Sequence, residues 1–301
     1  MTTRTLTRDD LLPLAKGDGH KFSHGHALVL SGGAGHTGAA RLAARGALRI
    51  GAGLVTLGVP GSAQMEVAAQ VTAIMLARVG DEASFAGVLQ DPRITAVCLG
   101  PGLGVARSRG LVRVALGGRA EARLTSRPVS RASARPPRRG LVLDADALTA
   151  FSDDPTALFG MLHPHCVLTP HGGEFARLFP DIAKRLSETS CTRVVATRDA
   201  AMRAGCIVLL KGPETVIAAP DGRCSVHAAV GDRAVPWLAT AGAGDVLAGF
   251  ITGLLARGFD PMQAAETAAW VHVECALRVG PGLIAEDLPE QVPSVLRALG
   301  V

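Results

Sequence analysis

The sequence predicts an α/β protein in which helices cover both faces of a mostly parallel central sheet. Short, continuously apolar segments recur along the 301 residues and alternate with longer amphipathic segments. Strands that are apolar on both faces are typical of a parallel sheet buried between two helical layers. With 48% apolar and 19% charged residues, the chain can build a substantial core and is not expected to be disordered.

Each predicted strand is a short apolar run bounded by glycine, proline or polar residues. Six such runs predict buried strands at 26–31, 54–59, 94–99, 141–143, 167–168 and 206–210. Residues 215–219 and 224–228 flank Pro220-Asp221-Gly222 and predict a β-hairpin. We expect one domain spanning residues 1–301, with helices at 37–50, 62–69, 105–116, 174–179, 191–204, 243–256, 261–279 and 288–298.

The formal net charge of +5 comes from one segment. Residues 119–139 contain seven arginines and one glutamate, and the remaining 24 basic and 25 acidic residues nearly cancel. We interpret 119–139 as a solvated, mobile insertion, with a lid over an anionic ligand as the alternative. Because the basic charge is confined to this segment and aromatic residues make up only 3% of the chain, we expect no nucleic-acid partner.

Several features indicate a cytoplasmic protein. The N-terminus, MTTRTLTRDD, lacks the apolar core of a signal peptide. The longest stretches with few charges are 22–40, interrupted by three histidines and five glycines, and 237–256, which contains Asp245; neither predicts a membrane span. Six cysteines without C-x-x-C spacing predict buried thiols in a reducing compartment.

Two glycine clusters follow predicted strands. The first, 33–38, has the spacing GxGxxG, but the second strand does not end in the acidic residue that a dinucleotide-binding fold places there. A more general prediction remains, namely that backbone amides at a helix N-terminus face an anion or a polar group. The second cluster, 100–104, has three glycines in five residues and allows a ligand to approach the backbone closely, although a tight turn explains it equally well.

A third cluster, Ala241-Gly242-Ala243-Gly244-Asp245, leads into an apolar helix and is the most specific of the three. Successive glycine amides before a helix form an anion hole that the helix dipole strengthens. An aspartate at this place can accept a proton from a hydroxyl while the amides stabilise a phosphoryl group in transfer. The alternative is that Asp245 only caps the helix.

Charged side chains also follow three other predicted strands. Lys211 is one of only four lysines and ends an apolar run, where its charge can face phosphates or simply mark an exposed strand end. Asp144, Asp146 and Glu174 come after two further strands, and in open α/β sheets ligands bind outside the carboxyl ends of the strands. We expect Asp144 and Glu174 to hold Mg²⁺ through water; Asp146 is either a third such group or a helix cap.

In order and spacing, these motifs resemble the NAD(P)H-hydrate dehydratase family, which is related to the ribokinase-like kinases. The resemblance covers about residues 21–296, and the combination of TPHGGEF, KGPET and AGAGD is more specific than any one motif. It implies a three-layer α/β/α ribokinase-like fold. The stretches that carry it are HKFSHGHALVLSGGAGHTGAARLAARGALRIGAGLVT, CLGPGLG, LVLDADAL, VLTPHGGEFARL, VLLKGPETVIAAPDG and LATAGAGDVLAGFITGLLARG.

The resemblance also implies roles for particular residues. Asp245 is implied as the catalytic base and as a contact of the hydrated dinucleotide. Further contacts of that substrate would be Gly38, Ala39, Ala40, Gly102, Gly104 and His171. The contacts of the nucleotide, ADP or AMP, would be Lys211, Gly212, Pro213, Glu214, Thr215, Gly242 and Gly244.

The implied reaction is the ADP- or ATP-dependent dehydration of the S epimer of hydrated NADH or NADPH, with Mg²⁺. Phosphorylation of the C6 hydroxyl creates a leaving group, and elimination of phosphate restores the reduced cofactor. Family members commonly form tetramers, and we expect a separate epimerase to handle the R epimer. Two alternatives remain: a kinase of the same fold that phosphorylates a small alcohol such as a vitamin precursor, and a nucleotide-binding module without catalysis.

Overall fold

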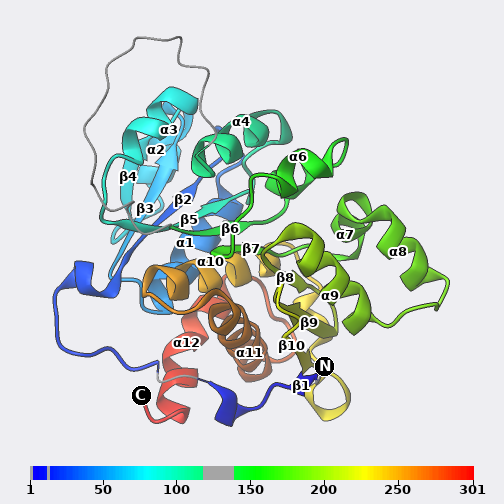
Figure 1. Cartoon of the computed structure of the whole chain (residues 1–301). Coiled ribbons are helices and arrows are strands. Elements are labelled where there is room, and N and C mark those ends of the chain that lie inside the picture. Colours follow the sequence, from blue (N-terminus) through cyan, green and yellow to red (C-terminus); the bar gives the residue numbers. More distant parts are fainter. Residues whose placement is uncertain (1–2, 12–13, 118–138) are drawn as a thin grey trace, which may run out of the picture.

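The computed structural model of this chain describes residues 3–11, 14–117 and 139–301. The predicted basic insertion at 119–139 therefore lies outside the described residues, except for Arg139. Ten strands form one sheet with the order β1-β10-β9-β8-β7-β6-β5-β2-β3-β4 (Figure 1). The strands are β1 Arg4–Thr5, β2 His26–Leu30, β3 Leu54–Val59, β4 Met75–Arg78, β5 Ile94–Leu99, β6 Gly140–Leu143, β7 Cys166–Leu168, β8 Ile207–Leu210, β9 Glu214–Ala218 and β10 Cys224–Ala228.

The sheet is mostly parallel, as predicted. Only β9 runs antiparallel to its two neighbours, β8 and β10, and it forms the predicted hairpin with β10. The helices are α1 Gly38–Arg49, α2 Gln64–Ala68, α3 Glu82–Val88, α4 Val105–Ala115, α5 Asp146–Thr149, α6 Pro155–Phe159, α7 Gly172–Leu178, α8 Pro180–Ser187, α9 Arg193–Ala204, α10 Ala243–Ala256, α11 Pro261–Val279 and α12 Asp287–Ala298.

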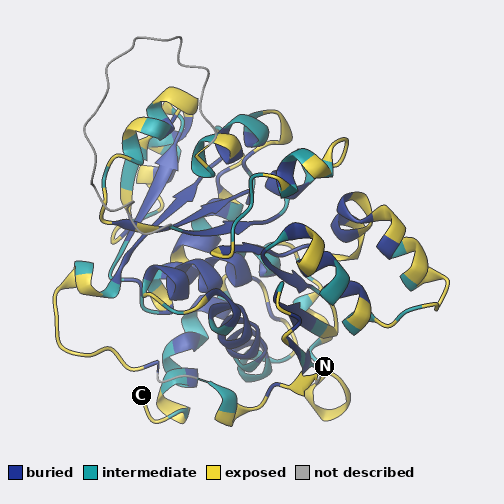
Figure 2. Cartoon of the chain, in the orientation of Figure 1, coloured by how far each residue is buried: buried dark blue, intermediate teal, exposed yellow. Residues whose placement is uncertain are grey.

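Two apolar cores lie on opposite faces of the sheet. Along β2, the side chain of Val29 joins one core, and those of Leu28 and Leu30 join the other, because successive side chains of a strand point to opposite faces. The first core contains α1, α10, α11 and α12, and the second contains α3, α4, α5, α7, α8 and α9. Figure 2 shows the sheet and α10 as buried layers inside these helices. The fold is therefore a three-layer α/β/α arrangement.

The most buried helix, α10, lies against the middle of the sheet. Twelve of its 14 residues are buried, which explains its apolar sequence. It packs against α1 and α11 of its own layer and against β5 and β6 of the sheet. None of the described helices is both long and apolar enough to cross a bilayer.

The predicted elements differ from the observed ones mainly at the edges of the fold. The bounds predicted for β3, β5, α10 and α11 are those observed, whereas β1, β4, α3, α5, α6 and α8 were not predicted. β4 forms one edge of the sheet, and its four residues are exposed or half-buried, so they form no buried apolar run. The helix expected at 191–204 begins at Arg193 instead, because the Thr192 hydroxyl accepts a hydrogen bond from the Val195 amide and caps it.

The order of the strands reverses beside β2. From β2 the chain continues to β3 and β4 on one side, and it then crosses to β5 on the other side and continues outward. In open α/β sheets, ligands bind at the carboxyl ends of the strands beside such a switch point. Here the switch point lies at the loops that follow β2 and β5.

Residues near the N-terminus close the opposite edge of the sheet. Arg4 and Thr5 form β1, which pairs in parallel with β10, and the Leu6 side chain is buried behind it. Arg4 also forms an ion pair of 2.8 Å with Glu266 of α11. The outer strand of the hairpin is therefore covered by another segment of the chain.

Candidate active site

The loops after β2, β5, β6, β7 and β8 all lie on the side of the sheet where the strands have their carboxyl ends, because these strands are parallel. They carry the polar residues singled out in the sequence. The loops also contact one another: a Cβ on Gly102 would lie 2.8 Å from the His36 carbonyl oxygen and 3.3 Å from the Ala39 Cβ. With a φ of 62°, Gly102 is in the left-handed region, so glycine suits this close approach of the β5 loop to the start of α1.

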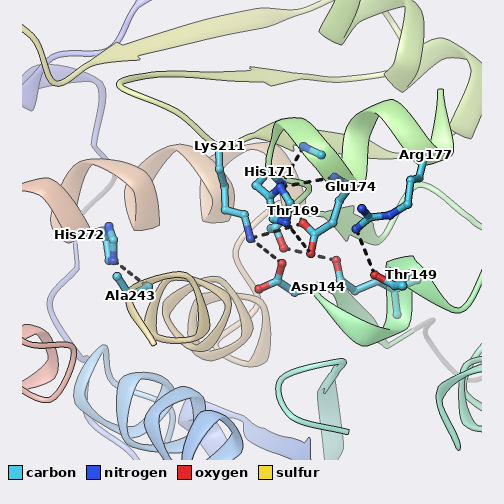
Figure 3. A network of polar contacts seen from close by, with 11 residues as sticks. Asp144, Thr149, Thr169, His171, Glu174, Arg177, Lys211, Ala243 and His272 are labelled. Atoms are coloured by element: carbon cyan, nitrogen blue, oxygen red, sulfur yellow. Dashed lines mark hydrogen bonds and ion pairs between the residues drawn. The ribbon is translucent and has the colours of Figure 1, made fainter. Parts of the chain in front are cut away.

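Lys211 is bound by two carboxylates that come from distant parts of the chain. Its Nζ lies 2.7 Å from Asp144 Oδ1 and 3.9 Å from Glu174 Oε2 (Figure 3). Burial alone would lower the pKa of Lys211, but the charges of Asp144 and Glu174 raise it above its usual value. Lys211 therefore stays protonated and available to an anion.

His171 and Glu174 hold the start of α7. The His171 Nδ1 accepts hydrogen bonds from the amides of Gly173 at 3.0 Å and Glu174 at 3.4 Å. In return, Glu174 Oε2 accepts one from the His171 amide at 2.8 Å. Because Nδ1 accepts, a neutral His171 carries its proton on Nε2. The His171 side chain is 55% exposed, so it remains accessible to a ligand at the edge of the sheet.

Asp245 lies in the first turn of α10 and faces the same group of charges. Gly242 caps this helix with a φ of 90°, so the chain turns sharply into Ala243, Gly244 and Asp245. Burial and the nearby charge of Asp144 raise the pKa of Asp245 to about 7, against the opposing effect of Lys211. An aspartate with this pKa can take up and release a proton near neutral pH.

A pocket of about 550 Å³ opens beside this turn. Lys211 and Gly244 lie at the part of its wall next to the carboxylates, and a Cβ on Gly244 would be 3.4 Å from Lys211 Nζ. Most of the remaining wall is apolar, as is typical of a site for a flat organic ring. The residues that line the pocket are Lys211, Gly212, Pro213, Thr215, His227, Ala229, Val230, Gly231, Ala234, Val235, Pro236, Leu238, Ala239, Ala243, Gly244, Leu247, Ala269, His272 and Val273.

The structure places most of the predicted nucleotide contacts at this pocket. Lys211, Gly212, Pro213, Thr215 and Gly244 line it. The Glu214 side chain is exposed and is not part of the wall, because β9 begins at this residue and neighbouring side chains of a strand point to opposite faces. Gly242 lies next to the wall rather than in it, and a Cβ there would meet Leu42 at 2.6 Å.

The predicted contacts of the dinucleotide lie around the switch point. Gly38 and Gly104 are exposed, whereas Ala40 is fully buried in the first core and could meet a ligand only through its backbone. The Gly104 amide donates a hydrogen bond of 2.8 Å to Asp146 Oδ2. Asp146 therefore ties the β5 loop to the β6 loop.

Four residues that the sequence did not single out also shape the site. Glu66 of α2 accepts hydrogen bonds from the Gly35 amide at 2.8 Å and the Thr37 hydroxyl at 2.5 Å, and so holds the glycine loop after β2. Arg193 donates a hydrogen bond to the Lys211 carbonyl oxygen at 3.1 Å. Two buried histidines, His227 and His272, line the pocket. Each of these contacts joins residues far apart in sequence, and no local motif indicates them.

The carboxylates suit a hydrated magnesium ion better than a metal bound only by protein. Among the residues that the structure describes, no group of three or more His, Cys, Asp or Glu side chains is placed to hold a metal. Asp144 and Glu174 both contact Lys211, which lines the pocket. Mg²⁺ usually keeps several waters and binds one or two carboxylates together with substrate phosphates. These residues therefore fit such an ion.

A comparison with protein-family models matches residues 27–292 to the model described as NAD(P)H-hydrate dehydratase. A bifunctional NAD(P)H-hydrate repair enzyme from Moorella thermoacetica is 36% identical over 96% of this chain and 52% of its own length. The chain thus spans about half the length of this and similar bifunctional relatives. An ADP-dependent (S)-NAD(P)H-hydrate dehydratase from Xanthomonas campestris is 32% identical over 98% of this chain and 97% of its own length.

A solved structure has the same fold. The ADP/ATP-dependent NAD(P)H-hydrate dehydratase from Bacillus subtilis, co-crystallized with ATP and Mg²⁺, superposes with a TM-score of 0.76 and 26% identity. The match covers 99% of each chain. The three-layer ribokinase-like fold expected from the sequence is therefore confirmed.

Proposed function

The chain belongs to the NAD(P)H-hydrate dehydratase family, and we propose that it catalyses the ADP- or ATP-dependent dehydration of the S epimer of hydrated NADH or NADPH. The observation that carries this proposal is the place of Asp245. Asp245 directly follows Ala243 and Gly244, which line a pocket of about 550 Å³, and burial together with nearby carboxylates raises its pKa to about 7. A base beside a nucleotide pocket is what a phosphoryl transfer from a nucleotide to a second substrate requires.

In this proposal the nucleotide occupies the pocket, with its phosphates toward α10. The ammonium group of Lys211 would neutralise phosphate charge, and the amides of Gly242 and Gly244 would bind the transferred group at the helix N-terminus. The apolar wall would hold the adenine ring. The other proposed contacts are Gly212, Pro213, Glu214 and Thr215; Glu214 would act through its backbone, since its side chain lies outside the wall.

The hydrated dinucleotide would bind at the switch point, on the other side of Asp245. Its nicotinamide end would lie near Gly102 and His171, whose ring is exposed and whose Nε2 lies 3.4 Å from Glu174 Oε1. The remaining proposed contacts are Gly38, Ala39, Ala40 and Gly104. The contact between the β5 loop and α1 supports this placement, because it brings both loops to one surface.

The proposed reaction has two steps. First, Asp245 removes the proton of the C6 hydroxyl as the oxygen attacks the terminal phosphorus, and the bond to the nucleotide breaks, releasing AMP from ADP or ADP from ATP. Second, the C6–O bond of the phosphate ester breaks with its electron pair, phosphate leaves, and loss of a proton from C5 forms the ring double bond. The phosphate oxyanion can accept that proton, so atoms and charge balance without a redox partner.

Asp144 and Glu174 are the residues that would hold Mg²⁺, through water. When bound, the ion would neutralise phosphate charge. The Lys211 ammonium group holds the two carboxylates next to each other, with its Nζ 2.7 Å from Asp144 Oδ1 and 3.9 Å from Glu174 Oε2. This arrangement supports a magnesium–nucleotide complex as the phosphoryl donor.

One assay tests the proposal against its alternative. Purified protein is incubated with hydrated NADH, ADP or ATP and Mg²⁺, and the absorbance of the reduced nicotinamide ring is followed. Recovery of absorbance with stoichiometric release of phosphate supports the dehydratase. Nucleotide consumption only with a small alcohol, giving a stable phosphate ester, supports the kinase, and nucleotide binding without turnover supports a binding module.

Three further proposals concern the protein as a whole. We propose that residues 1–301 act as one domain, that the chain forms a homotetramer in the cytoplasm, and that a separate epimerase supplies the S epimer. Five of the six cysteines are buried, which supports a reducing compartment. Trp237 and Ile284, which are 50% and 53% exposed, line one surface hollow and support self-association. Light scattering after size-exclusion chromatography measures the oligomeric state.

A further inference from the structure

A buried histidine interrupts the apolar helix α11. The side chain of His272 is only 7% exposed, and burial lowers its pKa to about 4, so its imidazole is neutral at neutral pH. A neutral imidazole has one donor nitrogen and one acceptor nitrogen. Burying such a polar ring costs free energy unless it has a well-placed partner.

That partner lies in the first turn of α10. His272 Nε2 is 2.9 Å from the carbonyl oxygen of Ala243 (Figure 3). Because a carbonyl oxygen only accepts, Nε2 must carry the proton. The imidazole also packs edge-on against Phe250 of α10, with ring centroids 6.1 Å apart and planes at 76°. Two contacts with α10 therefore set the orientation of the His272 ring.

The bonded carbonyl belongs to the turn on which the proposed chemistry depends. Ala243 is the first residue of α10 and directly precedes Gly244 and Asp245. The first amides of a helix have no partner within it, and the Ala243 amide donates instead to the Thr240 carbonyl oxygen at 3.4 Å. Ala243, Gly244 and His272 line the same pocket, and the hydrogen bond links its α11 wall to the turn beneath it.

We propose that His272 is a positioning residue, whose hydrogen bond to the Ala243 carbonyl oxygen holds the first turn of α10 in the position from which it contacts the nucleotide. The bond fixes the direction of the Gly244 amide and of the Asp245 carboxyl group relative to the pocket. His272 does not touch the reacting atoms in this scheme. The inference rests on the proposed function, since it gives His272 a part in that reaction through Asp245.

Two variants of His272 and one matched control test this role. His272→Leu removes the donor at similar bulk, whereas His272→Gln keeps an N–H donor. The control is His26→Leu: His26 is also buried, at 6% exposure, and its Nε2 is 2.8 Å from the Thr56 hydroxyl. His26 begins β2, at the end of the sheet opposite the site. Each leucine variant loses the hydrogen bond of a buried histidine, so both should be less stable than the wild type.

Turnover should separate these variants. We expect His272→Leu to lower kcat by about tenfold to a hundredfold with less than about a threefold change in the KM for ADP, because a small displacement of a catalytic group reduces the rate of chemistry. His272→Gln should recover most of the lost kcat, and His26→Leu should keep it. A His272→Leu protein that keeps its kcat, as His26→Leu should, would overturn the proposal. A His272→Gln protein as slow as His272→Leu would overturn it as well.

Amide hydrogen exchange gives a second measurement that needs no turnover. In His272→Leu, peptides that cover residues 242–247 should exchange faster than in the wild type, and in His26→Leu they should not. Equal exchange in the two leucine variants refutes the positioning role even if the wild type has no dehydratase activity. Absence of turnover in the wild type refutes the proposed function alone.

Discussion

Asp245 shares its surroundings with three other carboxyl groups and one ammonium group. Burial is the largest cause of its raised pKa, and Asp144, Asp146 and Glu174 add to it, while Lys211 opposes it. The resulting value of about 7 makes the carboxylate a stronger base than an exposed aspartate and keeps it partly ionised at neutral pH. The pKa of Asp245 therefore depends on the opposing effects of burial, the carboxylates and Lys211, and a single substitution can change it.

The pH dependence of the rate follows from this pKa. Since the ionised form of Asp245 is the base, kcat/KM should be constant above pH 7 and fall by about tenfold per pH unit well below it. In Lys211→Met the midpoint should move to higher pH, because Lys211 lowers the pKa of Asp245. Steady-state rates between pH 5 and 9 measure the pH dependence of kcat/KM in the wild type and the shift of its midpoint in Lys211→Met. A profile that stays flat to pH 5 contradicts the assignment of Asp245 as the base.

Replacing Asp245 should separate catalysis from stability. Asp245→Asn should lower kcat by about 10²- to 10⁴-fold, the usual range for a general base, and keep ADP binding. Because the pKa of Asp245 is raised from 3.8 to about 7 on folding, its contribution to stability is lost as the pH rises between these two values and stays lost above them. The variant should therefore melt higher than the wild type at pH 8, with a smaller difference at pH 5.

Calorimetry at the two pH values and ADP titration measure these effects. Asp153→Asn is a suitable control, because Asp153 is 70% exposed and pairs with Arg109 away from the pocket. It should keep turnover and gain no stability at pH 8. An Asp245→Asn protein that retains near-wild-type turnover refutes the catalytic role.

At the scale of elements, α10 combines a tightly packed body with a sharply turned N-cap residue. Its length is buried between α1, α11 and the sheet, so it cannot shift to accommodate a change at its start. Gly242 has a φ of 90°, and a Cβ on it would lie 2.6 Å from Leu42 Cδ1 and 2.8 Å from Ala285 Cβ. The turn therefore depends on glycine for both its backbone conformation and its space.

A pair of glycine variants tests this dependence. Gly242→Ala incurs both backbone strain and overpacking, whereas Gly258→Ala, with a φ of 89° and nothing within 4 Å of the new Cβ, incurs only strain. We expect about 1 kcal/mol of destabilisation for Gly258→Ala and about 1–3 kcal/mol more for Gly242→Ala. Only Gly242→Ala should also lower turnover. Equal losses of unfolding free energy in denaturant titrations contradict this account.

At the scale of the whole molecule, the site exists only when the sheet is complete. Asp144, Glu174, Lys211 and Asp245 lie on four separate segments, and the parallel strands bring them together. An unfolded chain therefore has no comparable site. A ligand that binds here stabilises the folded state by mass action.

ADP should therefore raise the melting temperature. At about a hundred times its Kd, a ligand that binds only the folded state adds about 2.7 kcal/mol to the unfolding free energy. Lys211→Met should lose most of this gain, because it removes the buried charge at the phosphate end of the pocket. Lys184→Met is the control, since Lys184 is 75% exposed and pairs with Glu188 on α8. Equal ADP shifts in both variants contradict the placement of the nucleotide.

Apolar runs made much of the fold predictable from the sequence. The strands Leu54–Val59 and Ile94–Leu99 and the helices α10 and α11 have the predicted bounds, because their residues are buried and their apolar pattern ends abruptly. β4 was missed because an edge strand has a neighbour on one side only and need not be apolar. β1 was missed because two residues carry no pattern.

The site was predictable where it follows strand ends and unpredictable where it depends on tertiary contacts. Asp144, Glu174 and Lys211 each follow a recognisable strand, so their meeting at one edge could be expected. The contacts of Glu66 with Thr37 and of His272 with Ala243 each join residues 29 positions apart on different elements. Nothing in the local sequence of either residue indicates its partner.

The short strand at the N-terminus has a consequence for solubility. An outer strand with free amides and carbonyls is a template for pairing with other molecules, and β10 would be such a strand without β1. Removal of residues 1–6 would uncover the backbone groups of β10 at Ser225 and Val226 and leave Glu266 without Arg4. The shortened protein should therefore associate through this uncovered ladder on storage, whatever happens at its active site.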